Sequence, residues 1–470
     1  MKLTGAQAVL ESLLKEGVHT IFGYPGGAII PVYDALYDYE DKIHHVLVRH
    51  EQAAGHAAEG YARISGKPGV ALVTSGPGAT NVVTAITDAM LDSVPMVVIS
   101  GQVHAHLLGS DAFQEADIIG ITTPITKWNY QITKASEIPE VFAKAFHIAG
   151  TGRPGPVLID ITKNAQTETL NYEYKPSPKI IGYQPTLKPN IRQLKAAALL
   201  LNQAERPFMF IGHGVLIAKA EKEVKQLAEK MGMPVGATLH GLSGLPTNHP
   251  NYVGMLGMHG NYGANILTNQ ADVILAVGMR FDDRVTGRLT DYVKNAKIIH
   301  IDIDPAELNK NVTADIPIVA DAKEALKQLL PLVKKNTHTA WLNKFKVYEQ
   351  EEEQQVKQPE IHPQTGKITM AEVINLLSEK TKGKAVIVAD VGQHQMIAAR
   401  YSKFAQTDSY ITSGGLGTMG FALPAALGAK MADTQREVIA VIGDGSFQMN
   451  IQELATLAQE QVPVKILVLN

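Results

Sequence analysis

The sequence contains no cysteine and only two tryptophans among its 470 residues. The absence of cysteine excludes a disulfide framework, a thiolate metal site and a cysteine nucleophile. No run of about 18 apolar residues occurs, so a membrane-spanning helix is not expected. The N-terminus has no basic or long apolar segment, and Thr4 with Gln7 forms a capping box from which we expect a helix. We therefore expect a cytoplasmic protein.

Long runs of one charge are also absent. The 43 Lys and Arg residues nearly balance the 46 Asp and Glu residues, which gives a formal net charge of −3. This balance disfavours nucleic acid or a membrane surface as a partner. The one dense patch, Glu349 to Gln355, indicates a solvated helix end or a linker.

Short β-branched runs alternate with helical patterns along nearly the whole chain, which is typical of parallel sheets covered by helices. The sequence therefore predicts an α/β fold of three doubly wound parallel-sheet domains at 1–165, 190–335 and 365–470. A polar stretch with several prolines, 166–190, is the expected linker after the first. The expected strands are 20–22, 46–48, 70–74, 96–100, 157–161, 208–211, 234–237, 273–277, 298–303, 318–320, 385–389, 438–442 and 464–469.

Gly443, Asp444, Gly445 and Ser446 follow a predicted strand and open a predicted helix. Glycines let a backbone approach a diphosphate closely, and a helix N-terminus directs N–H groups toward it. Asp444 offers a hard oxygen for Mg²⁺. A GDG sequence alone is more often an ordinary tight turn, but a further strand that ends at Asn470 completes the thiamine diphosphate motif.

The segment 443–470, GDGSFQMNIQELATLAQEQVPVKILVLN, resembles the acetohydroxyacid synthase (acetolactate synthase) large catalytic subunit family. Further segments match this family in order along nearly the whole chain. They are Arg49-His50-Glu51, Gly26-Gly27-Ala28, the SGPGATN segment 75–81, the DAFQE segment 111–115, the RPGPV segment 153–157 with Lys163, the GMHG segment 257–260 and the RFDDR segment 280–284.

The resemblance implies that the three domains bind the aminopyrimidine, FAD and the diphosphate, and that the last domain is incomplete. It assigns Glu51 to a hydrogen bond with N1′ of the aminopyrimidine, where it acts as acid and base. A zinc pair of the HExxH type fails here because residue 54 is alanine. Gly27, Gln114 and Lys163 join Glu51 as implied catalytic residues, and the implied substrate-binding residues are Ala28, Phe113 and Arg284.

The resemblance also implies the cofactor contacts. On the thiamine diphosphate side these are Val391, Gly392, Gln393, His394, Gly417, Met419, Gly443, Asp444, Gly445 and Ser446, with Asp444 as a metal ligand. On the flavin side they are Arg153, Gly212, Gly214, Met258, His259, Gly278, Arg280, Asp282, Asp302 and Asp321. The last two follow predicted strands, where acidic groups suit ribose or ribityl hydroxyls.

The implied reaction joins pyruvate, with loss of CO2, to a second pyruvate or to 2-ketobutyrate. The products are 2-acetolactate or 2-aceto-2-hydroxybutyrate, on the route to branched-chain amino acids. The implied cofactors are thiamine diphosphate, Mg²⁺ and FAD. The implied partners are these 2-ketoacids, further copies of the chain in a homodimer or homotetramer, and a small regulatory subunit.

Other enzymes and a non-enzyme remain as alternatives. The 280–284 segment argues against the catabolic acetolactate synthase, and Glu51 argues against glyoxylate carboligase. A pyruvate-oxidase-like enzyme would turn over its flavin. An NAD(P) dehydrogenase would need GxGxxG at the first strand–helix turn, which residues 23–27 do not fit. A truncated, catalytically silent flavoprotein or oligomer partner is the remaining alternative.

The last strand reaches the end of the chain without a helix to cover it, whereas buried parallel strands normally continue into one. In the family this segment ends in Asn-Asn, and the second Asn binds the metal; Asn470 matches the first. We therefore expect a fragment of a longer protein, which without that ligand and part of the substrate pocket would be inactive.

Overall fold

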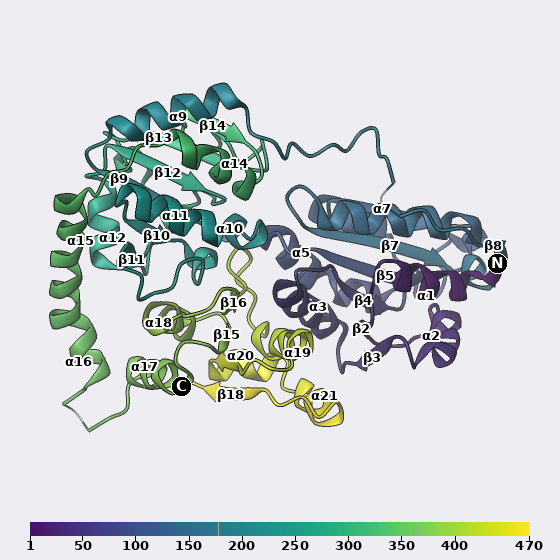
Figure 1. The fold of residues 1–470 in the computed structure, drawn as a ribbon. Coiled ribbons are helices and arrows are strands. Elements are labelled where there is room, and N and C mark those ends of the chain that lie inside the picture. The colour runs from purple at the N-terminus through teal and green to yellow at the C-terminus, as the bar shows by residue number, and fades with distance from the viewer. Residues whose placement is uncertain (177, 365) are drawn as a thin grey trace. The chain divides into compact units, whose positions relative to one another are not determined.

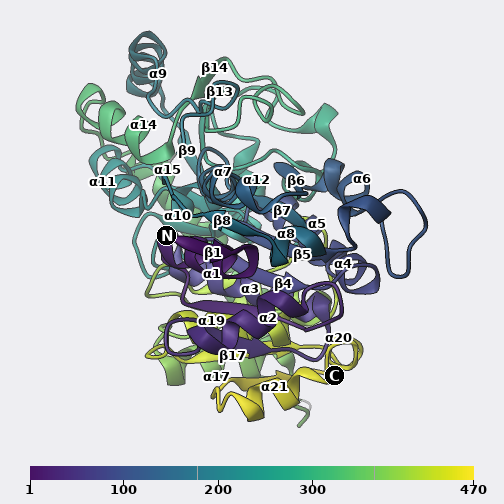
Figure 2. The same cartoon turned by 90° about the vertical axis from the view of Figure 1, so that its right-hand side faces the viewer.

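The computed structural model describes residues 1–176, 178–364 and 366–470 (Figures 1 and 2). The chain forms two compact units. The first contains Met1–Gln184, Val388–Gly392 and Thr412–Asn470, and the second contains Pro185–Ile387 and Gln393–Ile411. Residues of the first and third predicted domains therefore share one unit, and the three predicted domain boundaries stay a prediction.

The main sheet of the first unit has six strands in the order β3-β2-β4-β5-β7-β6, and its strands pair in parallel. The chain passes from β2 to β3 on one side and then returns to β4 on the other, so the strand order reverses between β2 and β4. In parallel α/β sheets ligands bind at the carboxyl ends of strands at such a reversal. The strands are β2 (Thr20–Gly23), β3 (His44–Leu47), β4 (Gly69–Val73), β5 (Met96–Gln102), β6 (Trp128–Ile132) and β7 (Pro156–Thr162).

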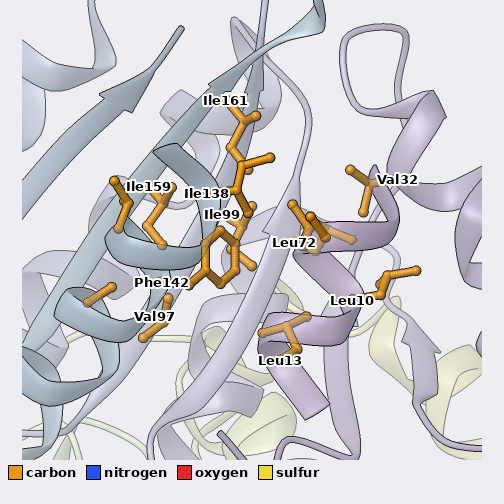
Figure 3. Close-up of a cluster of buried hydrophobic side chains, with 14 of the residues drawn as sticks. Leu10, Leu13, Val32, Leu72, Val97, Ile99, Ile138, Phe142, Ile159 and Ile161 are labelled. Atoms are coloured by element: carbon orange, nitrogen blue, oxygen red, sulfur yellow. The ribbon is translucent and has the colours of Figure 1, made fainter. Parts of the chain in front are cut away.

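Helices cover both faces of this sheet. Leu10, Phe142 and Ile159 belong to one buried cluster, in which helix and strand side chains interdigitate (Figure 3). Strand residues that alternate with this cluster, such as Val98 and Leu158, are also fully buried, as expected for a sheet covered on both sides. The helices of this part are α1 (Gly5–Lys15), α2 (Ile30–Leu36), α3 (Glu51–Ser65), α4 (Pro77–Asn81), α5 (Val83–Asp92), α6 (Ile118–Thr122), α7 (Ile138–Gly150) and α8 (Lys163–Thr167).

The capping box at Thr4 is confirmed: its side chain accepts from the Gln7 amide, and the Gln7 side chain accepts from the Thr4 amide. The structure adds a short strand before it. β1 (Lys2–Thr4) pairs antiparallel with β8 (Thr169–Asn171), which lies within the predicted linker. Three residues give too short an alternation to be distinguished from a loop in sequence.

The second unit contains a six-stranded sheet in the order β11-β10-β9-β12-β13-β14, paired in parallel. Its order reverses between β9 and β12. The strands are β9 (Pro207–Ile211), β10 (Val235–Ala237), β11 (Tyr252–Met255), β12 (Val273–Val277), β13 (Lys297–Asp302) and β14 (Ile316–Val319). The helices are α9 (Ile191–Gln203), α10 (His213–Ile217), α11 (Glu221–Met231), α12 (Tyr262–Thr268), α13 (Asp283–Thr286), α14 (Ala322–Leu329), α15 (Thr339–Glu352), α16 (Gln358–Ile361), α17 (Met370–Thr381) and α18 (Gln393–Tyr401).

The dense charged patch that begins at Glu349 is largely helical, because α15 extends through Glu352. This helix is anchored by Trp341 and Phe345, which lie in the core of the second unit next to Phe208. The Trp341 indole donates to the carbonyl of Pro207 at 2.9 Å. Two buried aromatic rings thus hold a helix whose outer surface is charged.

The third sheet has four strands in the order β16-β15-β17-β18, and its order reverses between β15 and β17. The strands are β15 (Val386–Ala389), β16 (Tyr410–Thr412), β17 (Val438–Ile442) and β18 (Lys465–Val468). The remaining helices are α19 (Ala422–Ala432), α20 (Asp444–Met449) and α21 (Glu453–Gln459). Within the three described ranges, no helix is long and apolar enough to cross a membrane.

Candidate active site

Glu51 is the first residue of α3, directly after the cap residue His50, whose ring accepts from the Gln52 amide at 3.2 Å. A carboxylate at a helix N-terminus is favoured by the partial positive charge of the free N–H groups. Glu51 is half-buried, and its Oε2 accepts from Nδ2 of Asn81 at 2.9 Å. Asn81 is the last residue of α4, so the loop after β4 directly contacts the predicted acid/base.

The loops after β2 and β4 meet at the reversal of the first sheet. The Ala28 amide donates to Thr74 Oγ1 at 3.3 Å, and the Ala28 carbonyl accepts from Gln166 at 2.8 Å. A Cβ on Gly26 would lie 2.5 Å from Thr74, whereas a Cβ on Gly27 would meet nothing within 4 Å. Gly27 thus borders open space, while Ala28 is fixed in the protein.

The predicted substrate residues lie on two further segments. Gln114 has a φ of 60°, and its backbone lies against Gly76, where an added Cβ would come within 2.8 Å of the Gln114 carbonyl. Phe113 is 89% exposed. Lys163 is half-buried and opens α8 at the carboxyl end of β7. Gln114 is therefore beside the loop that carries Asn81, and the roles of all three stay predictions.

Glu115 fixes the turn that carries Phe113 and Gln114. Its carboxylate accepts from the amides of Gly109 and Ala112. These hydrogen bonds, with that from Gly109 the largest, lower the pKa of Glu115 below its usual value. The exposed turn is thereby held by a charged group that faces its own backbone.

The loops of the third sheet also meet where its strand order reverses. Ser446 is buried, and its hydroxyl donates to the carbonyl of Val391 at 3.3 Å. A Cβ on Gly445 would lie 3.6 Å from Met419, and a Cβ on Gly417 would lie 3.9 Å from Val391. The structure therefore brings together three segments that lie apart in the sequence.

Other predicted residues of this region are placed as follows. Asp444 is exposed and opens α20, with Gly443 as the cap position. Gly392 is the last residue of the segment Val388–Gly392, which belongs to the first unit. Gln393 and His394 are the first residues of α18, which belongs to the second unit. Met419 is 39% exposed. An exposed Met419 and an exposed Asp444 are both accessible to a ligand.

Buried polar groups that the sequence analysis did not single out join α3 and α5 to the loop before α19. Asp92 accepts from the amides of Gly414 and Gly415 at 2.9 and 2.7 Å and from Arg63 at 2.8 Å. Asp88 accepts from the hydroxyl of Ser413 at 2.8 Å. These contacts hold the segment that leads to Gly417 and Met419.

His56 and Glu59 lie next to this group and are fully buried, with His56 Nδ1 2.9 Å from Glu59 Oε1. Burial raises the pKa of Glu59 well above its usual value, although Arg63 opposes this, and burial lowers the pKa of His56. Burial likewise raises the pKa of Asp88, and the nearby carboxyl group of Glu59 adds to this rise. The cluster favours neutral side chains at its centre.

The predicted flavin glycines lie at the reversal of the second sheet. The Gly214 amide donates to the Gly278 carbonyl at 2.9 Å. A Cβ on Gly214 would lie 2.7 Å from the Cα of Gly278, and one on Gly212 would lie 2.3 Å from its carbonyl oxygen. Gly278 also has a φ of +56°. The close packing of the two loops by itself explains why these positions are glycine.

The GMHG and RFDDR segments line one cavity of about 440 Å³ in the second unit. The Met258 amide donates to the Arg284 carbonyl at 2.8 Å, and the Arg284 guanidinium lies 3.3 Å from the Met258 sulfur. Asp282 caps α13, and its carboxylate lies 3.9 Å from Arg280. Two segments whose contact residues Met258 and Arg284 are 26 residues apart in sequence thus line one cavity.

The predicted acidic residues of this unit have local partners. Asp302 ends β13 and accepts from the Asp304 amide at 2.9 Å, and Asp321 caps α14 by accepting from the Glu324 amide at 3.0 Å. Arg153 lies in the first unit, where its Nε donates to Ser93 at 2.8 Å. Their contacts with a flavin stay predictions.

Comparison with known proteins identifies the family. Residues 3–121, 194–329 and 390–470 match families described as the N-terminal, central and C-terminal domains of thiamine pyrophosphate enzymes. The chain is 48% identical to the acetolactate synthase large subunit of Buchnera aphidicola and 47% identical to the acetolactate synthase isozyme 3 large subunit of Escherichia coli. Both alignments cover 100% of this chain and 82% of the relative. An acetolactate synthase of Mycobacterium bovis is 48% identical, over 100% of this chain and 76% of that protein.

The chain belongs to the acetolactate synthase family. The expected family, the α/β class and the thiamine diphosphate dependence are confirmed. The family assignment makes this chain a thiamine diphosphate-dependent acetolactate synthase of branched-chain amino acid biosynthesis.

The described residues fit the cofactor of this acetolactate synthase family. A Cβ on Gly27 would meet nothing within 4 Å, and Cβ atoms on Gly417 and Gly445 would meet only side-chain atoms, at 3.9 and 3.6 Å, so the backbone is accessible at these positions. Both ring nitrogens of the half-buried His259 lack a hydrogen-bond partner among the described residues of the second unit. Polar atoms in that state are expected where a ligand completes the site.

The groups that hold this site in place, without lining it, were not predicted from the sequence. Glu453 is fully buried in α21 and accepts from the Arg49 amide at 2.9 Å, next to the start of α3. Burial raises the pKa of Glu453. A glutamate in an amphipathic helix normally faces water, so no local signal distinguishes this residue.

Proposed function

We propose that the protein joins pyruvate, with loss of CO2, to a second pyruvate or to 2-ketobutyrate. The observation that carries this proposal is the hydrogen bond from Asn81 to Glu51, which joins the start of α3 to the segment after β4, at a sheet reversal where Gly27 borders open space. Bound thiamine diphosphate supplies a nucleophilic carbon that adds to a ketone and holds the electron pair left when CO2 departs. Glu51 would hold a proton at N1′ of the aminopyrimidine and so help to form that nucleophilic carbon.

Residues of the third sheet would hold the charged end of the cofactor. Asp444 would provide an oxygen to Mg²⁺, and the loop from Gly443 to Ser446 would approach the diphosphate through its backbone. Val391, whose carbonyl accepts from Ser446, would line the same space. Gly27 and Gln114 would face the reacting ketoacid, and Lys163 would attract its carboxylate.

We assign FAD and part of the substrate channel to the second unit. The cavity beside Met258 and Arg284 has the size expected for part of a large ligand. Arg284 offers a cation to a ketoacid carboxylate, and His259 offers two ring nitrogens that have no hydrogen-bond partner among the residues that the structure describes. Gly212, Gly278, Asp302 and Asp321 would complete the flavin contacts, as the family resemblance implies.

The proposed assembly contains at least two copies of the chain and a small regulatory subunit. The relatives from Buchnera aphidicola and Escherichia coli are named large subunits, which supports a smaller partner. By family resemblance, Glu51 of one protomer and the diphosphate loop of another share a cofactor. Size-exclusion chromatography with light scattering, with and without cofactors, would measure the assembly.

Acetolactate formation from pyruvate, with thiamine diphosphate, Mg²⁺ and FAD, tests this function. The assay compares the chain that ends at Asn470, a chain extended past it, and the Glu51→Gln variant of the active form. We expect acetolactate from the extended chain and a loss of at least roughly a hundredfold in Glu51→Gln. Oxygen- or quinone-linked turnover of pyruvate without acetolactate would instead favour an oxidase, and no turnover by either chain would favour a silent flavoprotein.

A further inference from the structure

We propose that Asn81 is a positioning residue for Glu51 and selects the carboxyl oxygen that carries the proton. This inference rests on the proposed role of Glu51. Nδ2 of Asn81 lies 2.9 Å from Glu51 Oε2, across 30 residues of sequence. Within the part of the chain that the structure describes, this is the one hydrogen bond to the Glu51 carboxyl group.

The chemistry of the Asn81 amide determines which oxygen of Glu51 can carry the proton. An amide NH2 can donate but cannot accept, so the oxygen that it contacts must act as an acceptor. Oε2 is therefore the acceptor, and a proton on Glu51 resides on Oε1. A free carboxyl group could place the proton on either oxygen and rotate between them, and Asn81 removes that freedom.

The neutrality of asparagine matters as well. A Lys or Arg at this distance would favour the ionised carboxylate and lower its pKa strongly. An acid/base group must gain and lose a proton during each cycle. A neutral donor orients Glu51 without holding it in one charge state, which suits that task.

The segment that carries Asn81 is fixed against Glu51 by its glycines. A Cβ on Gly78 would lie 3.3 Å from Glu51 Oε1 and 2.7 Å from Thr74. Gly76 adopts a φ of +57° at the start of α4, and an added Cβ there would meet Gln114. The contacts with Thr74 and Gln114 do not involve Glu51, and they set the position of α4, and hence of the Asn81 amide.

Three variants of the protein, expressed from its complete reading frame, test the inference. Asn81→Ala removes the donor. Asn81→Asp replaces it with a carboxylate of nearly the same shape. Asn171→Ala, at an exposed asparagine of β8, is the matched control. The measurements are kcat and KM for pyruvate, the pH dependence of thiamine diphosphate affinity by calorimetry, and the thermal unfolding midpoint.

We expect Asn81→Ala to lower kcat by roughly tenfold to a hundredfold with KM and the unfolding midpoint nearly unchanged. In Asn81→Asp the added carboxylate should repel that of Glu51 and move the acidic limb of cofactor affinity about one pH unit upward. Asn171→Ala should match the wild type in each measurement. Asn81→Ala added to Glu51→Gln should cause no further loss of kcat, because it acts through Glu51.

Two results would overturn the inference. One is full kcat in Asn81→Ala, and the other is an equal loss from Asn81→Ala in the wild-type and Glu51→Gln backgrounds. Full activity in Glu51→Gln would instead overturn the proposed role of Glu51 itself. The single and double variants therefore separate failure of this inference from failure of the proposed function.

Discussion

The carboxylate of Asp92 accepts a hydrogen bond of 2.7 Å from the backbone amide of Gly415. Asp92 is the last residue of α5, and Gly415 belongs to the loop that leads to Gly417 and Met419. This one carboxylate therefore connects two parts of the sequence that each contribute to the proposed cofactor site.

Asp92→Asn should destabilise the first unit. The substitution removes the charge that pairs with Arg63, whose side chain is 5% exposed, and an uncompensated buried charge costs about 3–5 kcal/mol. We expect a lower thermal unfolding midpoint and weaker thiamine diphosphate binding. Asp291→Asn breaks ion pairs at a 57% exposed aspartate, where water screens the charges, and should leave the unfolding midpoint nearly unchanged. Equal midpoints for the two variants would contradict the structural role of Asp92.

Gly428→Ala should prevent close packing of α19 against α3. The added Cβ would lie 1.8 Å from the carbonyl oxygen of Ala57, a backbone atom that cannot move away without shifting the helix. We expect a loss of several kcal/mol, of the order that core overpacking causes, measured by denaturant unfolding. Gly182→Ala is the control, because a Cβ there meets nothing within 4 Å. An unchanged midpoint in Gly428→Ala would show that the two helices do not pack this closely.

His45 should make stability depend on pH between about 4 and 6.5. Burial lowers the pKa of His45 from its usual 6.5 to about 4. The unfolded state therefore binds more protons in this window, and stability falls as pH decreases from 6.5 toward 4, by at most roughly 3 kcal/mol. His45→Phe keeps the edge-to-face contact with Tyr33 but cannot titrate, so it should flatten this part of the stability profile. Parallel profiles for the two proteins would refute this origin.

Asp444→Asn should weaken Mg²⁺-dependent binding of thiamine diphosphate by more than roughly tenfold, because a neutral amide is a poorer ligand for a hard cation. The side chain is exposed, so the unfolding midpoint without cofactor should not change. Calorimetric titration with and without Mg²⁺ measures the effect. The control is Asp41→Asn, at another exposed aspartate. Equal Mg²⁺ dependence in both variants would remove Asp444 from the proposed metal site.

The sequence by itself determined the parts of this protein that depend on local pattern. Most of the predicted strands are present within one or two residues, because parallel strands such as β5 and β12 are continuous apolar runs bounded by polar turns. The Thr4 cap and the placement of Glu51 at a helix start were also predictable, since both follow from neighbouring residues. Strands β1, β8, β11 and β16 were missed because they have only three or four residues, and β6 was missed although Trp128–Ile132 alternates apolar and polar residues.

The tertiary structure alone decided which distant residues meet. Asn81 contacts Glu51, and Asp92 contacts Gly415, across separations that no pattern in the sequence encodes. The tertiary structure also decided that Glu59 and Glu453 are buried. Their positions could not be predicted from the sequence, because glutamates normally face solvent. Local physics thus fixes the strands and the helix starts, whereas partners and protonation follow from packing, because they depend on what the folded chain brings within a few ångströms.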